Sequence, residues 1–137
     1  MTNAALAHRY VSLWNEPATA RRRQLIEAIW TPDGRHLLQP PEEMRAIAAR
    51  PGLAMHAVLE AHGYAALEAR ATSVYEHWVA SEGIEFRGRD DVDRLADLAK
   101  LHWEAVDRDG AVIAVGLSLL VLAADDRIER DYTFIVA

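Results

Sequence analysis

Cysteine is absent from the 137 residues of the chain. Its absence excludes disulfides, thiolate metal sites and a cysteine nucleophile, and it fits the cytoplasmic location that we expect. No long apolar run is present either. The longest, from Ala111 to Ala124, is interrupted by Gly116 and Ser118 and is shorter than the ~20 residues that span a bilayer. The first residues lack the basic-then-apolar pattern of a signal peptide. We therefore expect no membrane association.

Basic residues are in the minority. The chain has 15 Lys and Arg against 21 Asp and Glu, a net charge of −6, which argues against nucleic acid as a partner. The one basic cluster, Arg21-Arg22-Arg23, lies in a helical pattern and is interpreted as a solvated helix face. No Gly-, Ser- or Pro-rich linker divides the chain. We expect one domain over residues 1–137, a common size for a single hydrophobic core.

The first part of the chain is predicted to be helical. Apolar residues at spacings of three and four predict a helix that ends at Asn15-Glu16-Pro17 and a second helix that ends near Trp30. Residues 31–34 are predicted to turn, and residues 35–39 to form a short strand. A helical elaboration is expected around residues 40–63. A longer helix is predicted from about residue 64 to residue 81, with an apolar stripe formed by Leu67, Ala71, Val74, Tyr75 and Trp78.

The second part is predicted to form strands. A short extended piece is expected at residues 84–87, followed by strands at 95–106, 111–122 and 128–136. The composition of residues 95–106 also fits a helix. The turn signals Arg108-Asp109-Gly110 and Asp125-Asp126-Arg127 separate the last three. Helices followed by consecutive strands predict an α+β domain, with helices packed on an antiparallel sheet.

Several segments together carry a resemblance to a known superfamily. They are Tyr10-Val11-Ser12-Leu13-Trp14-Asn15-Glu16-Pro17, then Trp30-Thr31-Pro32-Asp33-Gly34, then Leu101-His102-Trp103-Glu104, and finally Asp126-Arg127-Ile128 with Asp131-Tyr132-Thr133-Phe134. This pattern resembles the nuclear transport factor 2-like superfamily, and within it the polyketide-cyclase-like (SnoaL-like) branch. The resemblance implies a cystatin-like cone, an α+β barrel whose strongly curved antiparallel sheet wraps around a helix. It also implies a homodimer through the sheet. Because this fold hosts isomerases, cyclases, dehydratases, hydrolases and binding proteins, it does not define an activity.

Tyr10 matches the tyrosine that, in the ketosteroid-isomerase branch, donates a hydrogen bond to a developing enolate. A phenol in a dry pocket is a strong donor to an oxyanion. The alternative is a helix tyrosine whose ring packs in the core. The other residues of that branch are missing. Its general base falls at Gln39, whose amide cannot accept a proton at neutral pH, and its second donor falls at Ser118. Isomerisation by that mechanism is therefore not expected.

Asp131 is the leading acid–base candidate. Cyclase-like relatives place polar residues on the final strand, facing the cavity, and burial raises the pKa of a carboxyl toward neutrality, which suits proton transfer. The alternative is a solvent-facing residue paired with Arg127 or Arg130.

His102 and Glu104 lie on the same face of their predicted strand, because alternate residues point the same way. They are expected to form an acid–base pair in the pocket. In the opposite register, Trp103 lines the pocket and His102 lies on the dimer face. The sequence leaves both registers open.

The four tryptophans fall on separate elements, and we interpret them as core residues that also line a pocket for a ligand. They are Trp14, Trp30, Trp78 and Trp103. No His-x-x-x-His pair or glycine-rich phosphate loop is present, so no metal and no cofactor is expected.

These features predict a small-molecule-binding protein. If the protein is an enzyme, we expect a cofactor-independent cyclase or isomerase that acts on a small, apolar, oxygenated substrate. Asp131 or His102 is then the base and Tyr10 the donor. The pocket residues are expected to be Ser118 and Glu104 with the four tryptophans. The alternative is a non-catalytic ligand-binding or dimerisation module of the same fold.

Overall fold

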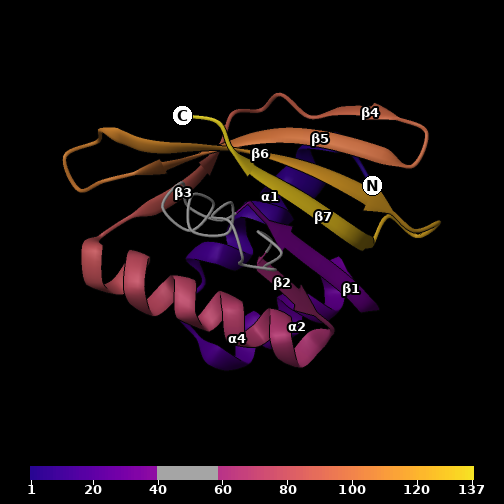
Figure 1. Ribbon diagram of the computed structural model, residues 1–137, viewed down its shortest axis with the longest axis horizontal. Helices are drawn as coiled ribbons and strands as arrows, with labels where there is room; N and C mark the ends of the chain where they lie inside the picture. Colours follow the sequence, from indigo (N-terminus) through magenta and orange to yellow (C-terminus); the bar gives the residue numbers. More distant parts are fainter. Residues whose placement is uncertain (40–58) are drawn as a thin grey trace, which may run out of the picture.

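The computed structural model of the protein describes residues 1–39 and 59–137. Figure 1 shows the helices α1, α2 and α4 on one side of a curved sheet. The elements are α1 (Asn3–Asn15), α2 (Thr19–Ile29), β1 (Trp30–Leu38), β2 (Leu59–His62), α4 (Tyr64–Val74), η1 (Tyr75–Ala80), β3 (Glu85–Gly88), β4 (Asp93–Leu95), β5 (Leu98–Val106), β6 (Val112–Leu122) and β7 (Ile128–Ile135).

The sheet has seven strands in the order β2-β1-β7-β6-β5-β3, with β4 pairing to β5. The predicted meander of β5, β6 and β7 is confirmed, and the fold is α+β with helices on the sheet. Two details differ from the expectation. β1 pairs with β7 in parallel, so the sheet is mixed. Its described end strands, β2 and β3, do not pair, so the sheet is not closed into a barrel. Hairpin turns fix the direction of consecutive strands only, and they carry no information about β1, which joins the sheet from the other end of the chain.

Helix α1 packs its apolar stripe onto the sheet. The Thr2 hydroxyl caps its first turn by accepting a hydrogen bond from the Ala5 amide at 3.1 Å, and the helix ends before Pro17. Its buried residues are Leu6, Ala7, Tyr10, Leu13 and Trp14. The end of α1 is tied to the sheet by the side chain of Asn15, which exchanges two hydrogen bonds of 2.8 Å with the Phe86 backbone. The inward face of α1 is thereby fixed over β5, β6 and β7.

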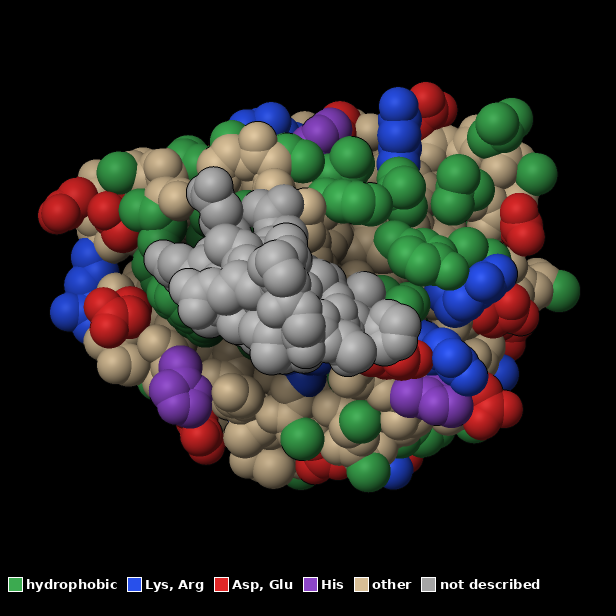
Figure 2. Space-filling view, viewed as in Figure 1, with side chains coloured by type: hydrophobic (Ala, Val, Ile, Leu, Met, Phe, Trp, Pro, Cys, Tyr) green, Lys and Arg blue, Asp and Glu red, His purple; other side chains and the backbone are tan. Residues whose placement is uncertain are grey.

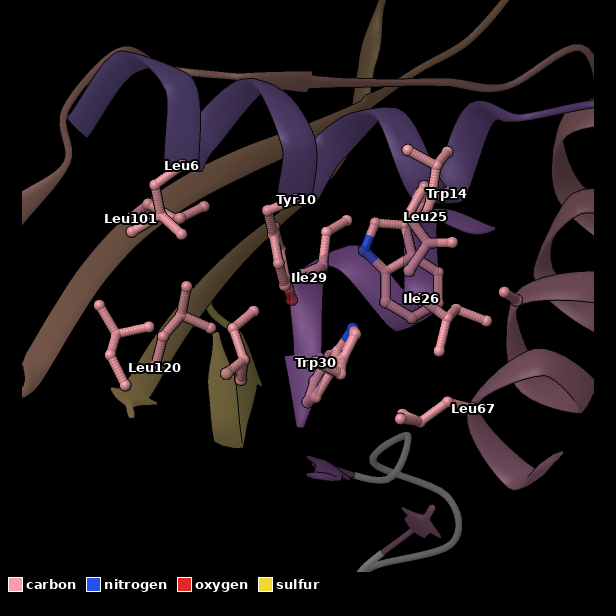
Figure 3. Packing of buried hydrophobic residues seen from close by; sticks show 14 of the residues in the cluster. Leu6, Tyr10, Trp14, Leu25, Ile26, Ile29, Trp30, Leu67, Leu101 and Leu120 are labelled. Atoms are coloured by element: carbon pink, nitrogen blue, oxygen red, sulfur yellow. The ribbon is translucent and has the colours of Figure 1, made fainter. Parts of the chain in front are cut away.

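The core lies between the helices and the sheet. Figure 3 shows side chains from α1, α2 and α4 converging on residues of the strands, with Tyr10 projecting from α1 and its oxygen at the inner end. The cluster is formed by Leu6, Tyr10, Leu13, Trp14, Leu25, Ile26, Ile29, Trp30, Ala61, Leu67, Ala71, Ala99, Leu101, Leu120, Leu122 and Ile128. Tyr10 therefore carries a polar group into an apolar layer.

Two local predictions are wrong. Residues 31–34 are an irregular part of β1 rather than a turn, because the pairing with β7 shifts register between Trp30 and Arg35. Residues 59–62 form β2, which pairs antiparallel with β1, rather than the end of a helical elaboration. Residues 40–58 of that expected elaboration lie outside the described residues.

Arg22 and Trp78 are also placed differently from expectation. Arg22 is buried rather than solvated: it donates to the Glu16 carbonyl at 2.8 Å and lies over the Tyr75 ring. Trp78 is 51% exposed. The predicted long helix becomes a π-helix over Tyr75–Ala80, and the wider turn rotates later residues away from the stripe that Leu67 begins.

Candidate functional site

Polar side chains from four elements meet inside the apolar layer. Ser118 on β6 lies opposite Thr133 on β7. Asp131 lies two residues earlier on β7 and therefore on the same face. Tyr10 reaches these three from α1, and His36 on β1 is in parallel register with Asp131. All five side chains are buried, and Asp131 has no exposed surface. We call Tyr10, His36, Ser118, Asp131 and Thr133 the Asp131 cluster.

Both carboxylate oxygens of Asp131 accept hydrogen bonds from hydroxyl groups. Tyr10 donates to Oδ2, and Thr133 donates to Oδ1 at 2.8 Å. Ser118 Oγ joins the two donors, at 2.8 Å from the Tyr10 oxygen and 2.9 Å from Thr133 Oγ1. Trp103 Nε1 donates to Ser118 Oγ at 3.2 Å. The acid is thus held by two donors that are themselves held by further donors, which fixes its orientation.

His36 connects the cluster to a cation. Its Nε2 lies 3.1 Å from Thr133 Oγ1 and 3.6 Å from Asp131 Oδ2. Its Nδ1 lies 3.0 Å from Nη1 of Arg70, which also donates to the His36 carbonyl at 2.9 Å. Arg70 comes from α4, so this contact joins the helical layer to β1. The His36 ring packs against Trp14, with ring centroids 5.3 Å apart.

Burial shifts the pKa values of these groups in different directions. The pKa of Asp131 rises from 3.8 to about 7, because loss of water around the carboxylate outweighs the hydrogen bonds from Tyr10 and Thr133 and the charge of Arg70. The pKa of Tyr10 is raised well above its usual value by burial and by the neighbouring Asp131. The pKa of His36 falls from 6.5 to about 3, through burial and then the charge of Arg70. Near neutral pH, Asp131 is therefore the group of this cluster that gains or loses a proton.

His102 and Glu104 lie on the other face of the sheet. Their neighbours Leu101, Trp103 and Ala105 point inward, so of the two faces that the sequence left open, the inner one carries Trp103 and the outer one carries His102. His102 Nδ1 pairs with Asp91 Oδ2 at 2.6 Å, and Glu104 pairs with Arg89 at 3.1 Å. These contacts keep both residues away from Asp131. The expected acid–base pair is not formed, and neither residue lines an interior site.

The tryptophans are divided between three environments. Trp14 and Trp30 are buried in the core, and Trp30 lies beside His36 at a ring distance of 6.1 Å. Trp103 packs inward over Gly116, where an added Cβ would lie 2.0 Å from the indole ring. Trp78 is exposed on η1 and does not reach the cluster. Three of the four expected pocket tryptophans thus lie on the inner side of the sheet.

Sequence reasoning missed His36, Thr133 and Arg70. Thr133 follows Asp131 at the strand period, and this signal was sufficient to place both side chains on one face. His36 alternates with Leu38 in the predicted strand at residues 35–39, yet its position opposite Asp131 depends on the parallel pairing of β1 with β7. No pattern in the sequence indicates that Arg70 lies next to His36.

Two of the hollows on the surface of the described residues lie away from the Asp131 cluster. One, of about 480 Å³, lies along α4 and η1 between Ala65 and His77. The other, of about 250 Å³, lies between α1 and β3 and is lined by His8, Ser12, Phe86 and Asp90 among others. Neither is lined by a cluster residue. The enclosed apolar pocket expected from the sequence therefore stays a prediction.

Residues 1–39 and 59–137 contain no group of three or more His, Cys, Asp or Glu side chains placed to hold a metal ion. Their helices are all too short or too polar to cross a membrane.

Comparison with known proteins supports the fold. The sequence matches no protein-family model and no curated protein. Among solved structures, a SnoaL-like family protein from Agrobacterium tumefaciens, proposed to be an isomerase, superposes with a TM-score of 0.77 at 20% identity, covering 100% of both chains. A proposed polyketide cyclase from Sinorhizobium meliloti gives a TM-score of 0.61 at 9% identity, over 98% of this chain and 100% of that one.

A third structure carries a ligand. It is a protein of ketosteroid isomerase-like fold from Catenulispora acidiphila in complex with trimethylamine, with a TM-score of 0.64 at 10% identity over 97% of this chain and 86% of that one. At these identities the likeness is one of fold. It confirms the SnoaL-like and nuclear transport factor 2-like architecture that the sequence resembles, and it leaves the activity to be argued from the Asp131 cluster.

Proposed function

We propose that the protein binds a small, largely apolar, oxygenated molecule and catalyses proton transfer on it without a cofactor, in the manner of an isomerase or cyclase. The observation that carries this proposal is a fully buried carboxyl, Asp131, whose pKa of about 7 lies near the working pH of most cells. A general base is most effective when its pKa is close to the ambient pH. Tyr10 supplies the matching donor, because its raised pKa keeps the phenol protonated.

The proposed reaction conserves atoms and electrons. The Asp131 carboxylate removes a proton from a carbon next to a substrate carbonyl, and the electron pair of that C–H bond moves toward the carbonyl oxygen. Tyr10 then donates its hydrogen bond to the resulting enolate oxygen instead of to Asp131. In a substrate with a carbon–carbon double bond next to the deprotonated carbon, the enolate is conjugated with that bond, and the Asp131 carboxylic acid returns the proton to its far carbon, so that the double bond moves next to the carbonyl. The product is an isomer of the substrate, so the reaction needs no oxidant or reductant.

Trp30 provides a further argument for a polar ligand atom near the cluster. Its Nε1 is buried and has no hydrogen-bond partner among the described residues. A buried N–H without a partner costs about 1–3 kcal/mol, and an oxygen of a bound molecule would satisfy it. The Trp30 ring lies beside His36, so this orphan donor belongs to the same part of the core as Asp131.

The test begins with a thermal-shift screen against polycyclic ketones, enones, epoxides and fatty acids. Carbonyl compounds that stabilise the protein are then incubated with it in D₂O, and deuterium incorporation next to the carbonyl is followed by NMR. Asp131→Asn is expected to lower the exchange rate by ~10²–10⁴-fold while the ligand still stabilises the protein. Asp109→Asn, which alters an exposed acid in the hairpin turn, is the matched control and is expected to retain full exchange. Full exchange in Asp131→Asn would contradict the proposal.

A second candidate function is a non-catalytic module that forms a homodimer through the outer face of the sheet, and one observation favours it. Because Ser118 and Leu120 point inward, Leu117 and Leu119 point outward, where they lie opposite Phe134 and Tyr132. Figure 2 shows hydrophobic side chains gathered over β6 and β7, and Phe134 is 41% exposed. A second copy of the chain would cover this apolar strip.

Sedimentation velocity distinguishes the assembly states. We propose that the protein acts in the cytoplasm. For the wild-type protein in dilute solution we expect a dimer. Leu119→Lys places a charge in the middle of the strip and is expected to give a monomer. A wild-type monomer at micromolar concentration would contradict the dimer, and it would leave the catalytic proposal intact.

A further inference from the structure

His36 has hydrogen-bond partners on both ring nitrogens, and one partner can only donate. The Arg70 guanidinium carries N–H donors and no acceptor. Its Nη1, 3.0 Å from His36 Nδ1, therefore requires Nδ1 to be an unprotonated acceptor. The neutral ring then carries its proton on Nε2, which lies 3.1 Å from Thr133 Oγ1. The second contact of Nη1, to the His36 carbonyl at 2.9 Å, holds the guanidinium in this position.

The direction of the hydrogen bonds follows from that tautomer. His36 Nε2 donates to Thr133 Oγ1, and the Thr133 hydroxyl is left to donate to Asp131 Oδ1 at 2.8 Å. With the proton on Nδ1 instead, Thr133 would have to donate to His36 and could not also donate to Asp131. The ring packs against Trp14 and Trp30, at centroid distances of 5.3 and 6.1 Å, so it cannot turn over, which would put ring carbons in the places of its two nitrogens, without repacking the core.

From this geometry we propose that Arg70 is a positioning residue that keeps His36 as a neutral Nε2–H donor, so that Thr133 donates to Asp131 and Asp131 alone exchanges the proton of the cluster. The consequence for turnover depends on the function proposed above, but the positioning can be measured without a substrate. The charged and titratable groups around His36 are Arg70 from α4, Asp131 from β7 and Tyr10 from α1, with Glu60 of β2 acting on Arg70.

The experiment is a two-dimensional ¹⁵N–¹H NMR measurement of the histidine rings between pH 5 and 8, with His36 assigned by the loss of its signals in His36→Gln. We expect the wild-type ring to carry one proton, on Nε2, over this whole range. A proton on Nδ1, or a doubly protonated ring at pH 7, would overturn the proposal. This measurement needs neither a substrate nor an Arg70 variant.

Arg70→Met supplies the second readout, because it keeps the side-chain bulk and removes the donor. The positive charge of Arg70 lowers the pKa of both His36 and Asp131. In this variant we therefore expect both pKa values to rise, so that the neutral His36 ring gains its second proton at a higher pH and the midpoint of the Asp131 carboxyl titration also moves to a higher pH. Arg35→Met is the matched control, because Arg35 precedes His36 on β1 and pairs with Glu60 at 3.3 Å. Unchanged titrations in Arg70→Met would show that Arg70 only fastens α4 to β1, and they would overturn the proposal.

The two proposals fail separately. If Asp131→Asn loses deuterium exchange but the His36 ring carries its proton on Nδ1, the proposed function is supported and the role of Arg70 is rejected. An Nε2–H ring with shifted titrations in Arg70→Met would support the role of Arg70 whatever the substrate screen finds.

Discussion

Replacing Asp131 with asparagine removes a buried acid while nearly preserving its shape, and the structure gives the size of the expected effect. The pKa of Asp131 is 3.8 in an exposed chain and about 7 in the fold, because burial disfavours the carboxylate. The folded state therefore binds this proton more tightly than the unfolded state. Stability from this group is complete below about pH 4 and is lost as the pH rises to 7. At about 1.4 kcal/mol per pH unit, the loss amounts to about 4 kcal/mol.

His36 has the opposite dependence. Its pKa falls from 6.5 to about 3 on folding, so the unfolded state binds this proton more tightly. Stability is then complete above pH 6.5 and is lost as the pH falls toward 3, by about 5 kcal/mol. Between pH 4 and 6.5 the fold gains one proton at Asp131 relative to the unfolded chain and lacks one at His36. The two contributions cancel, and the wild-type protein is expected to show little dependence on pH from this pair.

Single variants separate the two contributions. Urea unfolding is measured at intervals between pH 4 and 8 for the wild-type protein, Asp131→Asn, His36→Gln and the exposed control Asp109→Asn. For Asp131→Asn we expect the free energy of unfolding to rise by about 1.4 kcal/mol per pH unit from pH 4 to 6.5, and for His36→Gln to fall by a similar amount. At pH 8, Asp131→Asn is expected to be the more stable protein, by up to about 4 kcal/mol. An Asp131→Asn profile parallel to the wild-type profile would refute the reasoning.

Three further changes test single contacts. Gly116→Ala places a methyl group 2.0 Å from the Trp103 ring, so the ring must move and lose its hydrogen bond to Ser118. We expect this change to lower the free energy of unfolding by about 1–3 kcal/mol, measured by thermal unfolding. Unchanged tryptophan fluorescence and stability would contradict this packing. Asn15→Ala removes two hydrogen bonds of 2.8 Å to the Phe86 backbone and is expected to lower the free energy of unfolding, measured by urea titration, by about 2 kcal/mol. A loss below about 0.5 kcal/mol would contradict the contribution of these bonds. Tyr10→Phe removes a donor to Asp131 and is expected to raise the pKa of that carboxyl, measured by ¹³C NMR; a lowered pKa would rule out the bond.

Local patterns predicted the elements that bring Tyr10 and Asp131 together. A spacing of three and four placed Tyr10 on the buried stripe of α1, and turn residues marked the ends of β5, β6 and β7. The strand period of two is enough to put Thr133 on the same face of β7 as Asp131, although Thr133 was not predicted as a site residue. These signals are local, because each one depends on neighbours within a turn of helix or a few residues of strand.

The rest of the cluster depends on contacts between distant parts of the chain. His36 reaches Asp131 through the parallel pairing of β1 with β7, and the sequence carries no mark of that register. The orientation of His102 was open because the period of two sorts the residues of a strand onto two faces without indicating which face is buried. The indole of Trp103 settles it, since Gly116 leaves the space on the inner side. Trp78 was misplaced because a π-helix keeps helical composition while it changes the rotation per residue.

The free energies of the cluster bear on the choice between the two candidate functions. An apolar side chain of similar volume in place of a buried charged or polar network is often neutral or stabilising, because no desolvation has to be overcome. Asp131 is instead expected to lower the stability of the fold by about 4 kcal/mol as the pH rises from 4 to 7. A dimerisation module would use the outer strip around Leu119 and would gain nothing from an acid on the inner face. The proposed proton-transfer site requires that acid and the donor Tyr10, so the destabilising arrangement would have a use in catalysis that it lacks in assembly.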